Sequence, residues 1–185
     1  MTDILVTGGN GFIGRKLILK LQKKGYSCIS LNSQNGDITK IETFLDLPKV
    51  KYVFHLAAKS YVPESWNENN NFFLTNLVGT KNVLDYCKRV SANLIMASSY
   101  VYGIPQNLPI KEDHIINPNN PYALSKSLAE KVIEFEHSFN NINSVILRIF
   151  NIYGIGQNEN FLIPKIIKQI KNNENIKVFD LNPKR

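Results

Sequence analysis

Asp3-Ile4-Leu5-Val6-Thr7-Gly8-Gly9-Asn10-Gly11-Phe12-Ile13-Gly14 joins a short apolar run to a glycine-rich turn. The apolar run predicts a buried strand over residues 3–7, and the spacing of apolar residues over 15–24 predicts a helix. Strand, glycine-rich turn and helix, in this order, are typical of a dinucleotide-binding unit. An ordinary turn without a ligand is the alternative, but the helix N-terminus after the turn and the place of the motif at the start of the chain favour a nucleotide site.

The three spaced glycines of this turn have separate physical uses. Gly8 lets the chain leave the strand through a tight turn. Gly11 leaves room for backbone to approach a pyrophosphate, and Gly14 lets the helix pack close to the strand. The sequence therefore predicts phosphate binding by backbone N–H groups at the start of the helix.

Length and composition narrow the class of protein. A chain of 185 residues is long enough for one domain with its own core, and it contains no apolar run of the ~20 residues that a membrane span needs. Cys28 and Cys87 lack metal-ligand spacing, so we expect two reduced thiols, no metal site and a cytoplasmic location. The net charge is +7, but the basic residues are scattered along predicted helices, so neither nucleic acid nor a membrane is an expected partner. The chain enters its first strand directly, so we expect no secretion signal.

Apolar runs and helical periodicity alternate along the rest of the chain. This alternation predicts an α/β fold with a doubly wound parallel sheet, as in Rossmann-like proteins. Further strands are expected at residues 26–31, 51–56, 93–97, 144–149 and 176–179, and further helices at 41–47, 66–89, 121–139 and 161–171.

Several polar residues lie at positions that often contact ligands in doubly wound folds, at strand ends or on helices. Asn32 ends the second strand, where an acidic residue often binds ribose, and no Arg follows it, so NAD against NADP stays open. Asp37 suits either a helix cap or an adenine contact. Asn76 makes either a buried structural bond or a ligand contact. His55 is expected to be a packed strand residue rather than a catalyst, and Ser98 and Ser99 follow the strand at 93–97.

Tyr122 and Lys126 lie four residues apart at the start of a helix that opens with Pro121 after an Asn cap. Both side chains therefore project from one helix face. An ammonium beside a phenol favours the phenolate, so we expect a lowered pKa for Tyr122 and a role as a proton shuttle. A surface Tyr–Lys pair without function is the alternative, and the nucleotide fold upstream favours the chemical role.

Taken together, these motifs resemble those of the extended short-chain dehydrogenase/reductases, in particular the NAD-dependent epimerase/dehydratase group that acts on nucleotide sugars. The resemblance runs over nearly the whole chain. Its motifs are residues 7–14, Gly36-Asp37-Ile38, His55-Leu56-Ala57-Ala58, Asn76 with Gly79-Thr80, Ser98-Ser99 with Val101-Tyr102-Gly103, Tyr122 with Lys126, and Leu147-Arg148 with Asn151 and Tyr153-Gly154.

The resemblance implies roles for these residues. Tyr122 is the general acid and base, Lys126 binds the nicotinamide ribose, and Ser98 bonds the reacting oxygen, with Ser99 as the nearby alternative. The implied cofactor is NAD, with NADP not excluded, and hydride passes from a sugar carbon to it. Its implied binding residues are Gly8, Asn10, Gly11, Phe12, Ile13, Gly14, Asn32, Asp37, Ile38, Leu56, Ala57, Ala58, Asn76, Tyr122 and Lys126. The implied nucleotide-sugar contacts are Ser60, Ser98, Ser99, Tyr122 and Asn151.

Two departures from the family pattern shape the expected function. The family's 4,6-dehydratases carry an acidic residue directly after the catalytic hydroxyl, whereas this chain has Ser99 and Tyr100, which disfavours elimination of water. We therefore expect a nucleotide-sugar epimerase, with a 4-ketoreductase or a non-catalytic NAD(P)-binding fragment as alternatives.

The second departure is length. We expect an NAD(P)-binding domain over residues 1–155 and the beginning of a smaller substrate lobe over 156–185 that is cut short, leaving an incomplete enzyme. A homodimer through the helices at 66–89 and 121–139 is also expected.

Overall fold

The computed structural model describes residues 2–178 of the chain. Chain contacts divide the protein into two compact units, Met1–Phe150 and Asn151–Arg185. The expected domain limit at residue 155 thus lies inside the second unit. Each unit is described by itself below.

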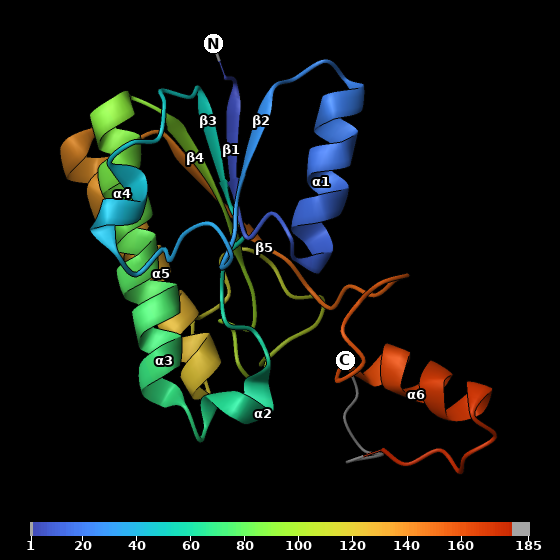
Figure 1. Cartoon of the computed structure of the whole chain (residues 1–185). Helices are drawn as coiled ribbons and strands as arrows, with labels where there is room; N and C mark the ends of the chain where they lie inside the picture. The colour runs from blue at the N-terminus through green and yellow to red at the C-terminus, as the bar shows by residue number, and fades with distance from the viewer. Residues whose placement is uncertain (1, 179–185) are drawn as a thin grey trace. The chain divides into compact units, whose positions relative to one another are not determined.

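A parallel sheet forms the centre of the first unit (Figure 1). Its strands are β1 (Ile4–Thr7), β2 (Cys28–Leu31), β3 (Tyr52–His55), β4 (Asn93–Ser98) and β5 (Ser144–Arg148), in the order β2-β1-β3-β4-β5. Each neighbouring pair runs parallel, with Val6 beside Ser30 on one side and Phe54 on the other. The chain therefore reverses its direction of winding at β1, which is where such sheets bind ligands.

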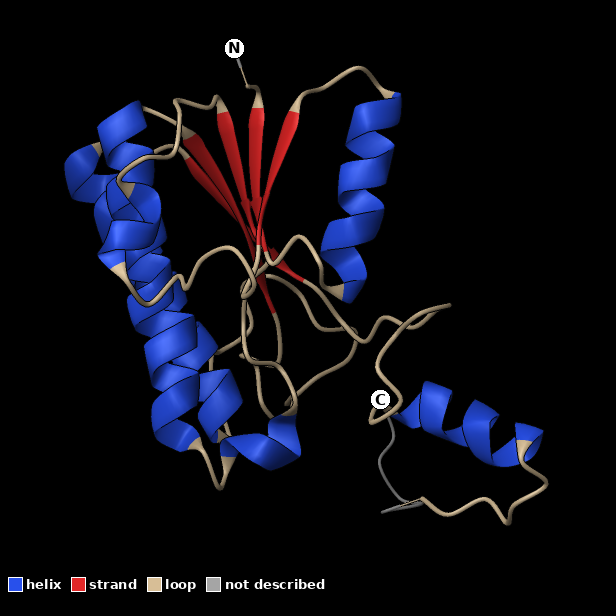
Figure 2. Cartoon of the chain, viewed as in Figure 1, coloured by secondary structure: helices blue, strands red, loops and turns tan. Residues whose placement is uncertain are grey.

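Helices cover both faces of this sheet, as Figure 2 shows, and this arrangement confirms the expected doubly wound fold. On one face, α1 (Phe12–Lys23) packs on β1 and β2. On the other face, α4 (Gly79–Val90) and α5 (Pro121–Asn140) pack on β3, β4 and β5. Shorter helical segments complete the unit: a 3₁₀ turn, η1 (Ile41–Phe44), the helices α2 (Val62–Ser65) and α3 (Asn69–Phe73), and a π-helical turn, η2 (Leu74–Val78).

The core lies between the sheet and the α4–α5 layer. Leu5, Val53 and Leu94 are completely buried in neighbouring strands, and Val83 of α4 and Ile133 of α5 pack against them. Parallel strands that are buried on both faces read as apolar runs, which is why these strands could be found in the sequence.

The second unit contains the helix α6 (Leu162–Lys171). Its apolar residues are largely exposed, with 56% of Leu162 and 56% of Ile170 accessible to solvent. The expected strand at 176–179 is not formed by residues 176–178, and Phe179 lies outside the described residues. Instead, the Gln169 side chain accepts a hydrogen bond from Lys177 N at 2.6 Å and donates to Lys177 O at 3.3 Å, so a side chain occupies backbone groups that a strand partner would use.

Candidate functional site

The glycine turn lies at the carboxyl ends of β1 and β3. Gly8 has a φ of +70°, and a Cβ placed there would lie only 2.7 Å from Ala57 N and 2.8 Å from the Leu56 carbonyl carbon. A side chain is excluded on both counts. The turn therefore passes directly against the segment that follows β3, where Gly8 lies beside Leu56 and Ala57.

The two other spaced glycines of the turn differ in their surroundings: Gly14 is packed against backbone, and Gly11 is exposed. A Cβ on Gly14 would lie 2.2 Å from Gly8 O, so close packing requires glycine there. A Cβ on Gly11 would meet only Gly8 O, at 3.1 Å, and Gly11 is exposed. The helix α1 begins at Phe12 without a capping side chain and without an acidic residue in its first turn. These features leave room and positive potential for a diphosphate, so the residues present fit a dinucleotide.

The loop after β2 contacts this turn through two amides. Asn10 donates a hydrogen bond from Nδ2 to Gln34 Oε1 at 3.3 Å. Asn32 accepts a bond from Gln34 N at 3.0 Å, and its own N–H donates to Asn35 Oδ1 at 2.7 Å. The loop that would face the adenosine ribose is therefore held by amide groups, with Asn32 inside that network.

Asp37 and Ile38 serve structure in this chain. Asp37 Oδ1 accepts bonds from Thr39 N at 2.9 Å and Thr39 Oγ1 at 2.8 Å, and these bonds lower the pKa of its carboxyl. The residue before η1 is Lys40, so Asp37 does not cap that helix. Ile38 is buried, and its Cδ1 would lie 2.6 Å from a Cβ on Gly79. Their predicted adenine contact stays a prediction.

Ser98 and Ser99 differ in what their hydroxyls do. Ser98 is the last residue of β4 and only 2% exposed, and its Oγ has no hydrogen-bond partner among residues 2–178. Ser99 Oγ instead donates to Ile149 O at 2.5 Å. A buried hydroxyl without a partner is rare in folded proteins. The geometry therefore favours Ser98 over Ser99 as the hydroxyl that would bind a reacting oxygen.

Tyr122 and Lys126 begin the helix α5 as expected. Asn120 caps the helix by accepting a bond from Ala123 N at 2.9 Å, and Pro121 follows it. Both residues are buried, with 7% of Tyr122 and 2% of Lys126 exposed. They are therefore not the solvent-facing pair that was the alternative interpretation.

The expected lowering of the Tyr122 pKa is wrong for the chain by itself. Burial raises the pKa of Tyr122 to about 12, and Tyr100 adds to the rise. Burial also lowers the pKa of Lys126 to about 8, against the attraction of the Glu130 carboxylate. Both pKa shifts have the same cause. The free-energy cost of removing the phenolate or the ammonium from water exceeds the stabilisation that nearby charges provide.

A chain of buried hydrogen bonds links β1 to the π-helical turn. Ala57 N donates to Thr7 Oγ1 at 3.2 Å, and Thr7 Oγ1 lies 2.7 Å from His55 Nδ1. His55 Nε2 lies 2.9 Å from Thr80 Oγ1, which donates to Asn76 O at 2.6 Å. Burial lowers the pKa of His55 to about 3, helped by the Lys126 charge. His55 is thus a packed, neutral strand residue, as predicted.

Asn76 continues this connection to α5. Its Oδ1 accepts a bond from Lys59 N at 2.9 Å, and its Nδ2 donates to Lys59 O at 3.0 Å and to Ser125 Oγ at 2.9 Å. Ser125 Oγ in turn donates to Tyr122 O at 2.7 Å. Asn76 therefore makes the buried structural bonds that were one of its two expected roles, and its predicted ligand contact stays a prediction.

Glu130, a residue outside the sequence motifs, forms an ion pair with the motif residue Arg148, which in turn contacts Tyr102. Arg148 at the end of β5 donates from Nη2 to the fully buried Glu130 carboxylate at 2.8 Å and from Nη1 to Tyr102 Oη at 2.9 Å. This pair joins α5, β5 and the loop after Ser98. Sequence reasoning missed Glu130 because an acidic residue on a long helix is usually solvated.

Two predicted substrate residues are not brought into the site by these contacts. Ser60 is exposed in the loop after β3. Asn151 belongs to the second unit. Both stay predictions.

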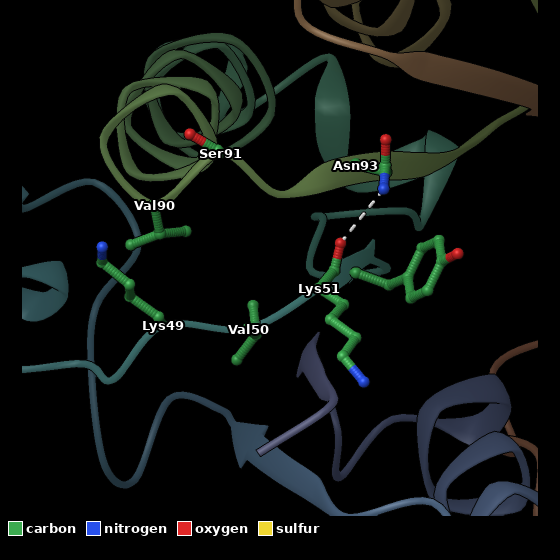
Figure 3. A pocket seen from close by; sticks show the side chains of 7 residues that line it. Lys49, Val50, Lys51, Val90, Ser91 and Asn93 are labelled. Carbon is green, nitrogen blue, oxygen red and sulfur yellow. Dashed lines mark hydrogen bonds between the residues drawn. The ribbon is translucent and has the colours of Figure 1, made fainter. Parts of the chain in front are cut away.

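Other potential sites are few. The two cysteines are free thiols, and no group of three metal-ligating side chains occurs within residues 2–178. A surface hollow of about 390 Å³, seen in Figure 3, lies at the amino ends of β3 and β4, opposite the edge with the glycine turn. Within the described part of the chain, no helix is long and apolar enough to cross a membrane.

Comparison with known proteins identifies the family. The model of the NAD dependent epimerase/dehydratase family matches residues 4–185. The chain therefore belongs to this family, as its motifs predict.

Individual relatives carry out different reactions. A GDP-6-deoxy-D-talose 4-dehydrogenase from Aggregatibacter actinomycetemcomitans is 33% identical, over 98% of this chain and 64% of its own length. The crystal structure of a UDP-glucose 4-epimerase from Thermotoga maritima with UDP-glucose has a TM-score of 0.91 at 27% identity and covers 97% of this chain and 66% of that one. A dTDP-glucose 4,6-dehydratase from Streptomyces venezuelae, crystallised with NAD, has a TM-score of 0.88 at 26% identity and covers 93% and 63%. The chain thus spans about two thirds of the length of these proteins, which are a dehydrogenase, an epimerase and a dehydratase.

Proposed function

We propose that this chain is the NAD-binding part of a nucleotide-sugar epimerase, with Tyr122, Lys126 and Ser98 as its catalytic residues. The observation that carries the proposal is the buried Ser98 hydroxyl without a partner, at the same sheet edge as the glycine turn. Solved relatives that share the fold contain NAD. The carboxyl edge of a parallel sheet is also where such folds bind nucleotides.

The chemistry follows from the three side chains. NAD, when bound, would accept a hydride from a sugar carbon and later return it to the opposite face of that carbon. Tyr122 takes the proton from the hydroxyl on that carbon and returns it after the sugar presents its other face. Ser98 donates a hydrogen bond to the reacting oxygen from a water-poor position, where such a bond is strongest. Lys126 binds the nicotinamide ribose and supplies a positive charge that favours the Tyr122 phenolate.

The residues after Ser98 support an epimerase over a dehydratase. Elimination of water needs an additional acid and base, and the two positions after Ser98 hold Ser99 and Tyr100. The Ser99 hydroxyl is bonded to Ile149 O. Inversion at a carbon needs no group beyond the three named.

A nucleotide-sugar 4-ketoreductase is the second candidate. The supporting observation is the 33% identity to a GDP-6-deoxy-D-talose 4-dehydrogenase. The two reactions differ in redox balance, because a ketoreductase consumes one NAD(P)H for each sugar whereas an epimerase regenerates its cofactor.

A substrate panel tests the proposal. The whole protein is incubated with NAD and UDP-, GDP-, CDP- or dTDP-hexoses, and in a second series with NADH or NADPH and the corresponding 4-keto-sugars. Products are followed by NMR, by mass and by absorbance of the reduced cofactor. A new epimer of unchanged mass supports the proposal. Net cofactor oxidation with keto-sugars identifies a reductase, loss of one water identifies a dehydratase, and NAD binding without turnover identifies a non-catalytic binding protein.

A homodimer through α4 and α5 is proposed as the assembly. The end of α5 exposes 56% of Phe135 and 72% of Phe139, whose ring centroids are 4.7 Å apart. An exposed aromatic pair of this kind suits an interface between two copies of the chain.

A further inference from the structure

The backbone at Tyr100 has an unusual conformation. Its φ is +64°, in the left-handed region that bulky L-residues avoid. Ser91 and Asn141 share this region, but they are the residues that end α4 and α5, where a left-handed residue is a common stop signal. Tyr100 ends no helix. It follows Ser98 by two residues, so its conformation requires another explanation.

The turn at Tyr100 places its ring against Tyr122. Gly103 N donates to Tyr100 O at 3.2 Å and closes the turn. The Tyr100 and Tyr122 ring centroids are then 5.9 Å apart, with an interplanar angle of 72°. This edge-on contact is a favoured geometry for aromatic pairs.

A second ring holds Tyr122 in a similar way. Phe72 of α3 lies 6.4 Å from Tyr122 at an interplanar angle of 81°. The Asn120 cap fixes where α5 begins, but it does not fix the side-chain torsions of Tyr122. The two rings, from the loop after β4 and from α3, restrict those torsions. Strained backbone persists where surrounding contacts over-determine it, and it gathers at functional sites.

We propose that Tyr100 is a positioning residue, whose left-handed turn after Ser98 sets its ring against Tyr122 and thereby orients the phenol for proton transfer. The inference rests on the proposed role of Tyr122 as acid and base. The contact that carries this role is made by the Tyr100 ring, which Tyr100→Phe would retain.

Kinetics of four variants of the whole protein test this role. Tyr100→Phe keeps the ring, and Tyr100→Ala and Tyr100→Leu remove it. Ser91→Ala is the matched control, because it places alanine at a positive φ outside the site. We expect Tyr100→Phe and Ser91→Ala to stay within about threefold of the parent kcat. Both ring-removing variants should lose roughly 10²-fold in kcat, the cost of a misplaced catalytic group, while NAD affinity stays within about threefold. Leucine fills part of the space of the ring, so Tyr100→Leu still tests the proposal if Tyr100→Ala fails to fold.

A spectroscopic readout does not depend on turnover. In protein labelled with 13C at the tyrosine ring, the Tyr122 resonance is assigned by its loss in Tyr122→Phe. It should shift when Tyr100 becomes Leu and stay in place when Tyr100 becomes Phe. Unchanged kcat and resonance in Tyr100→Leu overturn the proposal, and so does a Tyr100→Phe variant as slow as Tyr100→Leu, because the hydroxyl would then act directly. If the parent turns over no sugar, the proposed function fails, and the resonance alone still decides whether Tyr100 holds Tyr122.

Discussion

The variants Gly11→Ala and Gly14→Ala distinguish a glycine required for NAD binding from a glycine required for packing of the fold. A Cβ at Gly14 would lie 2.2 Å from Gly8 O and 2.9 Å from Gly9 Cα, and both are backbone atoms that cannot rotate away. A Cβ at Gly11 would meet only Gly8 O, at 3.1 Å. Gly11 has a φ of −70° and a ψ of 172°, which alanine adopts freely.

The two variants should therefore differ in stability. Gly14→Ala forces backbone apart, an overpacking that costs about 1–3 kcal/mol. At roughly 2–4 °C per kcal/mol for a chain of this size, its melting temperature falls by about 2–12 °C. Gly11→Ala gains about 0.4–1 kcal/mol by restricting the unfolded chain, and the tight contact with Gly8 O offsets part of it. Its melting temperature should stay within about 3 °C of the parent.

Gly11→Ala, which should barely change stability, is the variant expected to weaken NAD binding directly. The Gly11 methyl group occupies the space proposed for the pyrophosphate, and a clash worth ~1.4–3 kcal/mol weakens NAD binding by about 10–100-fold. Thermal unfolding followed by circular dichroism and titration of NAD against intrinsic fluorescence measure both quantities. If a well-folded Gly11→Ala protein binds NAD as tightly as the parent, the glycine turn is not the phosphate site.

Three further predictions concern the catalyst, pH and assembly. Tyr122→Phe should lower sugar turnover by about 10²–10⁴-fold while NAD titrations stay near the parent curve, and near-normal initial rates would rule out this acid–base assignment. The pKa of His55 is lowered to about 3, so below pH 6.5 the unfolded chain binds a proton that the folded chain does not, and stability falls as the pH drops from 6.5 toward 3. His55→Gln should flatten this fall in urea unfolding series, and an unchanged slope would contradict it. Phe139→Glu should convert the proposed dimer to a monomer in sedimentation experiments, and an unaltered mass would place the interface elsewhere.

Local signals were sufficient for the strands of the first unit and for α1 and α5. The helix expected at 66–89 is instead divided into α3, a π-helical turn and α4, the one expected at 41–47 is the 3₁₀ turn η1, and α2 was not predicted. The β1 run is apolar because the strand is buried on both faces, and Gly8 and Gly14 are fixed by contacts with nearby backbone. Strand ends moved by up to two residues, as with β2, which begins at Cys28 rather than at residue 26. Such limits depend on where the neighbouring strand stops pairing, which a single strand's own residues do not encode.

Long-range pairing explains what the sequence could not provide. The segment at 176–178 has the apolar character of a strand, but its Lys177 backbone pairs with the Gln169 side chain of α6. Sequence analysis also missed Ser125, because nothing in the residues between Tyr122 and Lys126 indicates a role for it. Its role depends on Asn76, which is 49 residues away in sequence and 2.9 Å away in space.

The pKa of Tyr122 shows why periodicity predicts neighbours better than it predicts chemistry. Spacing of four residues correctly placed Tyr122 and Lys126 on one helix face, and this placement predicted a lowered pKa for Tyr122. Burial reverses this sign, because it penalises phenolate and ammonium alike and moves both pKa values toward the neutral forms, to about 12 and about 8. A proton shuttle near neutral pH therefore requires additional positive charge beside the phenol, which a bound oxidised nicotinamide would supply. On this reasoning burial alone would keep the Tyr122 phenol protonated near neutral pH, and a bound oxidised nicotinamide would lower its pKa toward the range that the proposed proton transfer needs.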